Sequence, residues 1–151
     1  TVLQQKSTLL EDIRRIIRLY DSMLKPVCQW YGLVPLEATI ISFLHNNPGK
    51  DTAADIVEYR MLSKSNVSTA VESLIQKGLL LRRQDQEDRR KIHLSTTPKA
   101  KPITQEIETV REAFRRKIFR GFSEKELELF GAFQQRLAEN TKIAMERRDG
   151  Q

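Results

Sequence analysis

The chain contains 151 residues, of which 39% are hydrophobic and 30% are charged, and its net charge is +6. A chain of this length and composition can bury a core, so we expect an ordered chain with one domain, alone or with an extension. No apolar run is close to the roughly 18 residues that a membrane-spanning helix needs, so we expect no membrane partner. A single cysteine and the lack of a signal peptide favour a cytoplasmic location.

Motifs for catalysis and metal binding are missing from the sequence. One cysteine and two histidines provide no spacing for a set of metal ligands. A Gly-rich phosphate loop, a G-x-S-x-G nucleophile motif and an H-E-x-x-H motif are also lacking. We therefore expect a binding protein rather than an enzyme, with no metal and no cofactor.

The positive charge is concentrated in the second third of the sequence. Residues 60–101 contain ten basic and four acidic residues, and this excess of six accounts for the whole net charge. Such a concentration on one structural unit favours a polyanionic partner, and double-stranded DNA in particular. A solvated basic surface without a partner is the alternative.

The first part of the chain is predicted to be helical. Residues 7 to about 24 repeat apolar side chains at helical spacing, and Pro26 is expected to kink or interrupt this helix. Gly32 is expected to end it. A second helix is predicted to begin at Pro35 and to end at the turn formed by residues 46–49.

A helix-turn-helix is predicted next. Thr52 is the expected N-cap of a short helix, and Ser63 is the expected N-cap of the helix that follows. Apolar residues at helical spacing form the buried stripe of this second helix, and Gly78 is expected to end it. Ser63 and the small, polar or basic side chains that point outward from its first two turns are candidate DNA contacts: Ser63, Lys64, Ser65, Asn66, Ser68 and Thr69. An ordinary capped and solvated helix start is the alternative.

A β-hairpin with a charged tip is predicted after this helix. Residues 79–83 and 91–96 are expected to form its strands, with Ile92 and Leu94 facing inward and His93 facing solvent. The seven residues between the strands are all polar, which predicts a wing that inserts an arginine into the minor groove. The candidate DNA contacts on it are Asp88, Arg89, Arg90 and Lys91. A flexible exposed tip is the alternative.

Long amphipathic helices are predicted at both ends of the chain. Apolar residues recur at helical spacing over residues 103–118, and Ser123 begins a capping box for a last helix. Together with the first helix, these segments present more apolar surface than the hairpin and its helices can cover. We expect a second copy of the chain to bury this surface in a two-fold homodimer, and a monomeric six-helix bundle is the alternative.

The segments LSKSNVS at 62–68, KGLL at 77–80, DQEDRR at 85–90 and TT at 96–97 resemble those of the MarR family of bacterial transcriptional regulators. The flanking helices fall in the order found in that family, so the resemblance covers nearly the whole chain. Two residues depart from the family pattern. Met61 stands where the family commonly has glycine, and Thr96 stands where it usually has leucine.

The resemblance implies a mainly α fold with a small antiparallel β wing. A winged helix-turn-helix would occupy residues 33–97, and residues 1–32 and 98–151 would form a helical dimerisation region. The implied function is that of a homodimeric regulator, expected to be a repressor, on a pseudo-palindromic operator. Its recognition helix would enter the major groove, and Arg90, oriented by Asp88, would enter the minor groove. A protein-interaction module without DNA binding is the alternative.

The resemblance also raises the possibility of a small aromatic ligand that releases the DNA. Four aromatic residues lie on segments that could line a ligand site, although core packing is the simpler interpretation: Tyr20, Trp30, Tyr31 and Phe43. Cys28 is interpreted as a small buried side chain rather than an oxidant sensor, because a sensing thiol needs a lowered pKa and exposure.

Overall fold

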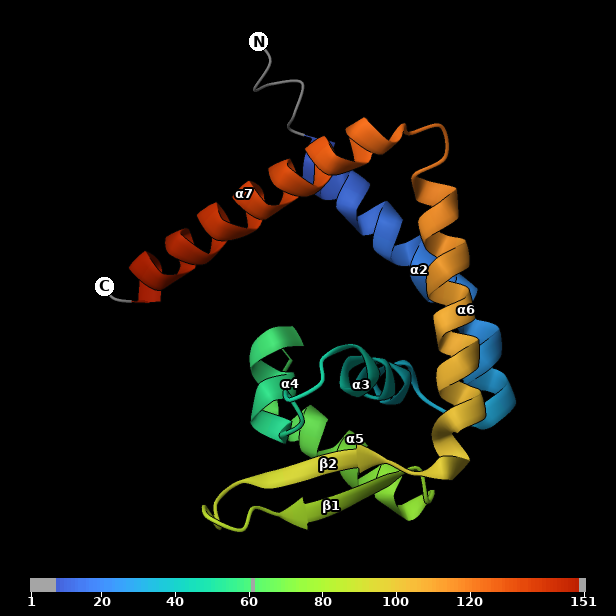
Figure 1. Ribbon diagram of the computed structural model, residues 1–151, viewed down its shortest axis with the longest axis vertical. Coiled ribbons are helices and arrows are strands. Elements are labelled where there is room, and N and C mark those ends of the chain that lie inside the picture. Colours follow the sequence, from blue (N-terminus) through green and yellow to red (C-terminus); the bar gives the residue numbers. More distant parts are fainter. Residues whose placement is uncertain (1–7, 61, 150–151) are drawn as a thin grey trace. The chain divides into compact units, whose positions relative to one another are not determined.

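A computed structural model of the chain describes residues 8–60 and 62–149 (Figure 1). The elements in chain order are α2 (Leu9–Tyr31), α3 (Pro35–Asn46), α4 (Ala53–Arg60), α5 (Lys64–Gln76), β1 (Leu80–Gln84), β2 (Ile92–Thr96), the short 3-10 helix η2 (Pro98–Ala100), α6 (Lys101–Ile118) and α7 (Glu124–Asp149). They form two compact units, which divide after Phe114. The predicted fold, mainly α with a small antiparallel wing, is confirmed.

The first helix is longer than predicted. α2 continues through Pro26, so the predicted interruption there is wrong, and it ends at Gly32 in the left-handed conformation, as expected. A proline removes only one backbone hydrogen bond from a helix. Burial of Leu24, Val27 and Cys28 on both sides of Pro26 holds the helix against the core. The predicted start at residue 7 lies outside the described residues.

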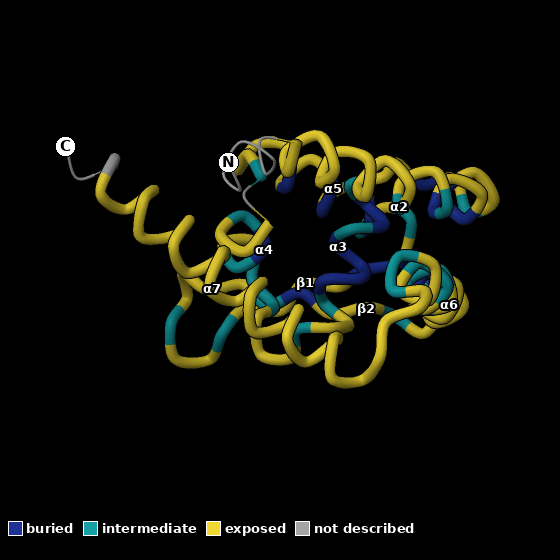
Figure 2. The backbone as a smooth tube through the Cα atoms, turned by 90° about the horizontal axis from the view of Figure 1, so that it is seen from above, coloured by how far each residue is buried: buried dark blue, intermediate teal, exposed yellow. Residues whose placement is uncertain are grey.

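α3 forms the centre of the first unit (Figure 2). Proline occupies its first turn, as predicted, and the carboxylate of Glu37 accepts a hydrogen bond from the Val34 amide at 2.8 Å. Ala38, Ile40, Ile41 and Phe43 are fully buried and contribute to the hydrophobic core of this unit. Because α3 is covered on several sides, it supports both α2 and the helix-turn-helix.

α4 and α5 form the predicted helix-turn-helix, and their N-terminal caps are those expected from the sequence. Thr52 and Asp55 exchange hydrogen bonds of 3.1 Å at the start of α4. The Ser63 hydroxyl accepts a hydrogen bond from the Asn66 amide at 3.2 Å at the start of α5. In the predicted stripe of α5, Val67, Val71 and Leu74 are buried and Ile75 is half-buried. Gly78 follows the helix with a φ of 76°.

The wing is a two-stranded antiparallel sheet whose register runs from Leu80 opposite Thr96 to Gln84 opposite Ile92. Thr52 forms an isolated bridge with His93 on the other edge of β2. Two orientation predictions are wrong here: Ile92 is exposed, and His93 is half-buried. A strand face is buried only where another element covers it, and the residues before α4 cover His93.

α2 and α6 run side by side in the first unit (Figure 1). The rings of Tyr20 and Phe114 pack edge to face, with their centroids 5.2 Å apart. Ile103 and Ile107 of α6 are buried. In the second unit, α7 begins with the predicted capping box, in which Ser123 and Glu126 exchange hydrogen bonds. Within the described part of the chain, no single helix is long and apolar enough to cross a membrane.

Candidate nucleic-acid interface

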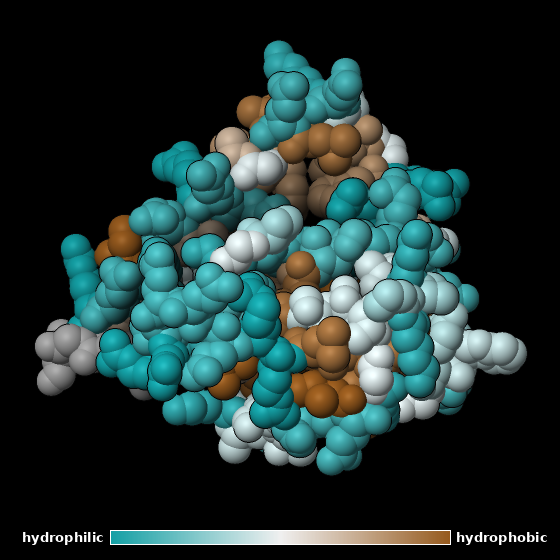
Figure 3. Space-filling model, turned by 60° about the horizontal axis from the view of Figure 1, so that its bottom comes forward, coloured by the Kyte–Doolittle hydropathy of each residue, from teal (hydrophilic) through white to brown (hydrophobic). Residues whose placement is uncertain are grey.

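The start of α5 presents a polar face to solvent. Ser63 caps the helix, and the candidate side chains that follow it are all exposed: Lys64, Ser65, Asn66, Ser68 and Thr69. The first turn contains no acidic residue. The backbone dipole adds partial positive charge at a helix N-terminus. Viewed from the side of α5, β1 and β2, the surface is mainly hydrophilic, and apolar side chains gather in smaller areas (Figure 3). This helix start therefore suits a negatively charged partner.

The tip of the wing is a hydrogen-bonded turn. The Asp85 amide donates to the Lys91 carbonyl at 2.9 Å, and the Lys91 amide donates to the Asp88 carbonyl at 3.0 Å. The side-chain amide of Gln84 donates to the Arg89 carbonyl at 2.9 Å. These bonds give the tip a defined conformation, which favours the wing interpretation over a flexible tip.

Asp88 orients Arg90 at this tip. Its Oδ1 atom accepts hydrogen bonds from the Arg90 backbone amide at 3.0 Å and from Arg90 Nε at 3.3 Å. The Arg90 side chain is nevertheless 92% exposed. Arg89 and Lys91 on either side are also exposed. The wing thus presents three adjacent cations, of which the middle one is held by a neighbouring carboxylate.

His93 joins the wing to the residues before α4, an arrangement that the sequence interpretation missed. Its Nδ1 atom lies 2.7 Å from Asp51 Oδ1, and its Nε2 atom lies 2.7 Å from Asp85 Oδ1. Hydrogen bonding to Asp51 and then to Asp85 raises the pKa of His93 above its ordinary value of 6.5. Hydrogen bonds, first from His93 and then from the Asp88 and Glu87 amides, lower the pKa of Asp85 to about 2. The interpretation of His93 as a plain exposed strand residue is wrong.

A second missed cluster connects α3 with the end of α5. Lys77 Nζ donates to both carboxylate oxygens of buried Glu37, at 2.8 and 2.9 Å, and to the Gly32 carbonyl at 2.9 Å. The Ser73 hydroxyl donates to the same carboxylate at 2.8 Å. Burial alone would raise the pKa of Glu37, but hydrogen bonds from Lys77, Val34 and Ser73 outweigh it and lower this pKa below 4.5. The cluster fixes the end of α5 against the turn after α2.

The four aromatic candidates for ligand binding do not share one environment. Phe43 lies in the core, and Trp30 is 81% exposed at the end of α2. Tyr20 packs against Phe114, and the Tyr31 hydroxyl hydrogen-bonds Glu106. Helical spacing predicts that residues share a helix face, but it does not predict which face meets a cavity.

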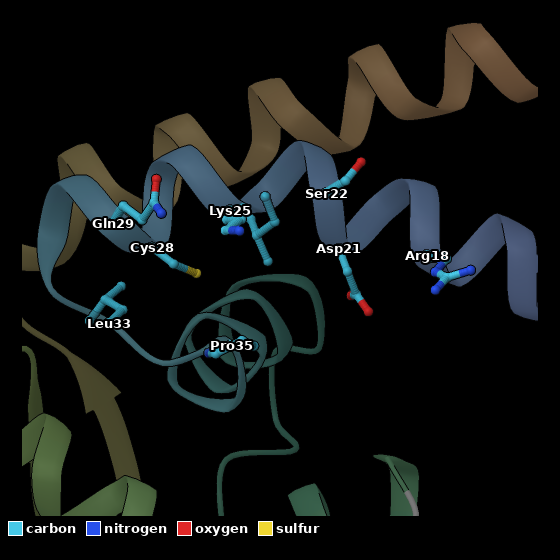
Figure 4. Close-up of a pocket in the computed structure, with 9 residues that line it drawn as sticks. Arg18, Asp21, Ser22, Lys25, Cys28, Gln29, Leu33 and Pro35 are labelled. Carbon is cyan, nitrogen blue, oxygen red and sulfur yellow. The ribbon is translucent and has the colours of Figure 1, made fainter.

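A groove of about 490 Å³ lies between α2 and the start of α3 (Figure 4). The described residues that line it include none of the four aromatic candidates: Arg18, Asp21, Ser22, Leu24, Lys25, Cys28, Gln29, Leu33 and Pro35. The Cys28 thiol points from α2 into the space between α2 and α3 (Figure 4). Cys28 is buried, as predicted, and burial followed by the nearby Glu37 charge raises the pKa of its thiol.

The two departures from the family pattern have different outcomes. Met61 lies outside the described residues. Thr96 is exposed at the end of β2, opposite the buried side chain of Leu80. A threonine at this position therefore does not place a hydroxyl in the core.

Solved structures with the same fold cover most of the chain. The sequence of MarR, whose crystal structure is known, is 24% identical to this chain. The two structures superpose with a TM-score of 0.73, and the match covers 92% of this chain and 94% of that one. A MarR family transcriptional regulator from Listeria monocytogenes, solved with a 26mer DNA, is 20% identical, with a TM-score of 0.76 and 87% of each chain covered. BpsR of Bordetella bronchiseptica, whose DNA binding is regulated by 6-hydroxynicotinic acid, is 18% identical, with a TM-score of 0.68 and coverage of 87% and 99%.

These likenesses establish the fold, and one segment of the sequence also matches a family model. Residues 31–91, which extend from the end of α2 through the tip of the wing, match the sequence model of the MarR family. The matched segment contains both α5 and Asp88–Arg90 of the wing tip. In this segment the sequence therefore resembles the MarR family, and the fold of the chain is that of the solved MarR structures.

Proposed function

We propose that this protein is a sequence-specific DNA-binding transcriptional regulator, a repressor that binds a pseudo-palindromic operator as a homodimer. The observation that carries the proposal is the pairing, on one compact unit, of an acid-free polar helix start with a wing whose arginine is held in place. These are the two surfaces that a winged helix-turn-helix uses on adjacent grooves of DNA. The Listeria relative, solved with DNA, supports the same use of this fold.

α5 is proposed to enter the major groove by its first two turns. Lys64 would contact phosphate, and the exposed polar side chains of Ser65, Asn66, Ser68 and Thr69 would meet base edges or the backbone. Ser63 would act through the cap that it already forms with Asn66. The Lys77–Glu37 cluster supports this role, because it fixes the other end of the helix to α3.

The wing is proposed to place Arg90 in the minor groove, with Arg89 and Lys91 beside the phosphates. Asp88 would orient Arg90 in the free protein, so less side-chain freedom is lost when DNA binds. Arginine inserted into a narrow minor groove meets an enhanced negative potential and reads groove width rather than individual bases. The two contacts would thus supply different kinds of sequence information.

Dimerisation is proposed to bring two such units onto one operator. We assign residues 33–97 to the DNA-binding domain and residues 1–32 and 98–151 to the dimerisation region. Large apolar side chains are exposed along the first half of α2 and along α7, including Ile13 and Ile17 on α2 and Phe133 and Leu137 on α7. A two-fold partner would cover them and would space the two copies of α5 by about one helical turn of DNA, ~34 Å.

The groove between α2 and α3 is proposed as the site of a small ligand that reduces DNA binding. Apolar side chains of Leu24, Leu33 and Pro35 line it, and the cations of Arg18 and Lys25 suit an aromatic carboxylate. Regulation of BpsR by 6-hydroxynicotinic acid supports this class of ligand. The same acid is a suitable first probe: it should weaken DNA binding, and Lys25→Met should reduce its effect. No effect at any soluble concentration would contradict this class of ligand.

The central experiment measures binding to random duplex DNA as a function of salt, followed by protection mapping on DNA that flanks the gene for this chain. We expect binding at low salt, a linear fall of the logarithm of the affinity with the logarithm of the salt concentration, and a protected palindromic site. No binding at low salt would contradict the proposal and would favour a protein-interaction module.

A further inference from the structure

His93 lies between two carboxylates that come from different parts of the first unit. Asp51 belongs to the connection between α3 and α4, and Asp85 belongs to the turn of the wing. The same α3–α4 connection reaches β2 through its backbone, because the Asp51 carbonyl accepts the Leu94 amide at 2.8 Å. The remaining charge that acts on His93 is Arg83, its register partner on β1. The His93 side chain is 21% exposed.

The two contacts require a particular protonation state of the ring. A neutral imidazole has one N–H group, and its other nitrogen carries a lone pair. Both ring nitrogens of His93 lie 2.7 Å from a carboxylate oxygen, and an ionised carboxylate can only accept hydrogen bonds. Both contacts are therefore attractive only when the ring is an imidazolium. Loss of one proton would leave a lone pair facing a carboxylate at this distance.

The bond from His93 to Asp85 also leads to the tip of the wing. The Oδ1 atom of Asp85 contacts His93. The Oδ2 atom of Asp85 accepts hydrogen bonds from the backbone amides of Glu87 at 3.0 Å and Asp88 at 2.8 Å. Asp88 in turn holds the Arg90 amide and side chain. A continuous series of hydrogen bonds thus connects Asp51 with Arg90.

We propose that His93 is a positioning residue for the wing: as an imidazolium it holds Asp85 to Asp51, and its deprotonation weakens binding to DNA. The inference rests on the proposed function, because its consequence concerns the wing contact with DNA. The chemical basis is the presence of two hydrogen-bond acceptors that face one titratable ring from two separate segments.

The sign of the pH dependence follows from the state that the two aspartates stabilise. Hydrogen bonds from the ring to Asp51 and Asp85 raise the pKa of His93 above 6.5 in the folded protein. The contribution of these bonds is fully present below the ordinary histidine pKa and is lost as the pH rises through the folded value. DNA affinity should therefore decrease on the alkaline side of pH 6.5.

The first part of the test follows the ring nitrogens of the free protein by ¹⁵N NMR. His45, the other histidine of the chain, lies exposed on α3 and supplies a second ring in the same sample. We expect His93 to titrate above 6.5 in the wild type and to titrate at lower pH in Asp51→Asn. Titration of His93 at or below 6.5 in the wild type would overturn the proposal without reference to DNA.

The second part measures the affinity for a duplex selected from a randomised library by the wild-type protein, at constant ionic strength and across the same pH range. The affinity of the wild type for this duplex should decrease by roughly tenfold as the pH rises, which is the order of one lost side-chain contact with DNA. His93→Gln should bind the duplex at every pH with the lower affinity that the wild type shows at alkaline pH. His45→Gln should show the same pH profile as the wild type. Equal pH profiles for His93→Gln and the wild type would overturn the link to DNA.

The outcomes separate the two proposals. If the wild type binds no duplex at any pH, the proposed function fails, and the role of His93 in DNA binding fails with it. If it binds with a pH-independent affinity although His93 titrates as expected, only the role of His93 is overturned. Should His93→Gln fail to fold, Asp85→Asn removes the same contact from the other side and is measured in its place.

Discussion

Arg90 shows how one exposed side chain can be oriented before DNA is present. Its neighbour Asp88 is two residues away, so a single turn supplies both the cation and the carboxylate that holds it. Side-chain ordering is a cost of association, and an oriented arginine reduces that cost. The carboxylate also neutralises part of the positive charge, so any benefit to the proposed DNA contact would come from geometry rather than from attraction.

The prediction for Arg90 is a loss of specific affinity. Arg90→Ala should weaken binding to a selected operator by about 1–3 kcal/mol at constant salt, because one minor-groove contact is removed. Fluorescence anisotropy with the operator and with a random duplex measures the effect. Arg15→Ala, which removes another exposed arginine from α2, is the matched control. An operator affinity unchanged from the wild type would show that Arg90 is not the wing contact.

Cys28 is predicted to react slowly with thiol reagents. Burial and the Glu37 charge raise the pKa of its thiol, so the reactive thiolate is scarce near neutral pH, and the side chain is shielded from the reagent. The rate of reaction with a chromogenic disulfide, compared with glutathione under the same conditions, tests this. A rate equal to that of glutathione would require an open path to Cys28 and would revive the oxidant-sensor alternative.

At the scale of the elements, the Lys77–Glu37 pair determines how α5 sits on α3. Lys77 contacts the carboxylate of Glu37 and the carbonyl of Gly32, so it connects the end of α5 with α3 and with the end of α2. Glu37 also caps α3 through the Val34 amide. A change at this position would therefore alter the support of α5, the helix that we propose to enter the major groove.

Removing the lysine should destabilise the fold. Lys77→Met leaves the buried carboxylate of Glu37 without its cation, which should lower the free energy of unfolding by roughly 2 kcal/mol. This is less than for a fully buried pair, because the Lys77 side chain is 35% exposed to solvent. Urea denaturation of Lys77→Met and of the control Lys101→Met, an exposed lysine at the start of α6, measures the difference.

The pH dependence of this difference has a definite sign. The pKa of Glu37 is lowered in the folded protein, so its stabilising contribution is present above its unfolded pKa and is lost as pH falls through the folded value, below 4.5. The gap between wild type and Lys77→Met should therefore narrow on acidification. A gap that stays constant from neutral pH to below this value would show that the pair is not ionised.

Most element boundaries can be predicted from the sequence because caps act locally. Gly32, Thr52, Ser63 and Ser123 each act on backbone atoms within a few residues, and all four positions agree with the structure. Pro26 is the exception, since the rule that a proline interrupts a helix is also local. There, burial of the side chains on both sides decides the outcome.

The missed parts of the site depend on contacts that are distant in sequence. Asp51 lies 42 residues before His93, and Glu37 lies 40 residues before Lys77. No spacing rule relates such residues, because their meeting depends on how the hairpin and α5 pack against α3. By contrast, Asp88 and Arg90 belong to one turn, and their pairing can be predicted from the motif alone.

At the scale of the whole molecule, α7 exposes several large apolar side chains to solvent. Its face carries Leu127, Phe130, Phe133 and Leu137, and each of these side chains is exposed in a single copy of the chain. Contiguous apolar surface of this kind on a protein marks an interaction site. The proposed homodimer would remove it from water, with identical surfaces contributed by both copies.

A charge on this face should therefore oppose assembly. Leu137→Glu is expected to shift the protein from dimer toward monomer and to weaken operator binding, because two half-sites would no longer be bound together. Sedimentation equilibrium gives the oligomeric state, and Gln135→Glu, which adds the same charge on another face of α7, is the control. A monomeric wild type, or a Leu137→Glu dimer of unchanged strength, would contradict the proposed dimerisation region.

The bridge between Thr52 and His93 has a further consequence for how copies of this protein avoid one another. It covers the outer edge of β2, so β1 supplies the other edge of this small sheet. A bare strand edge is a template for unwanted pairing between molecules, and charged side chains discourage it. Arg82 and Arg83 lie exposed on opposite faces of β1, and two copies aligned edge to edge would bring like charges close together on each face. These arginines would thus preserve the solubility of the protein at high concentration, independently of any contact with DNA.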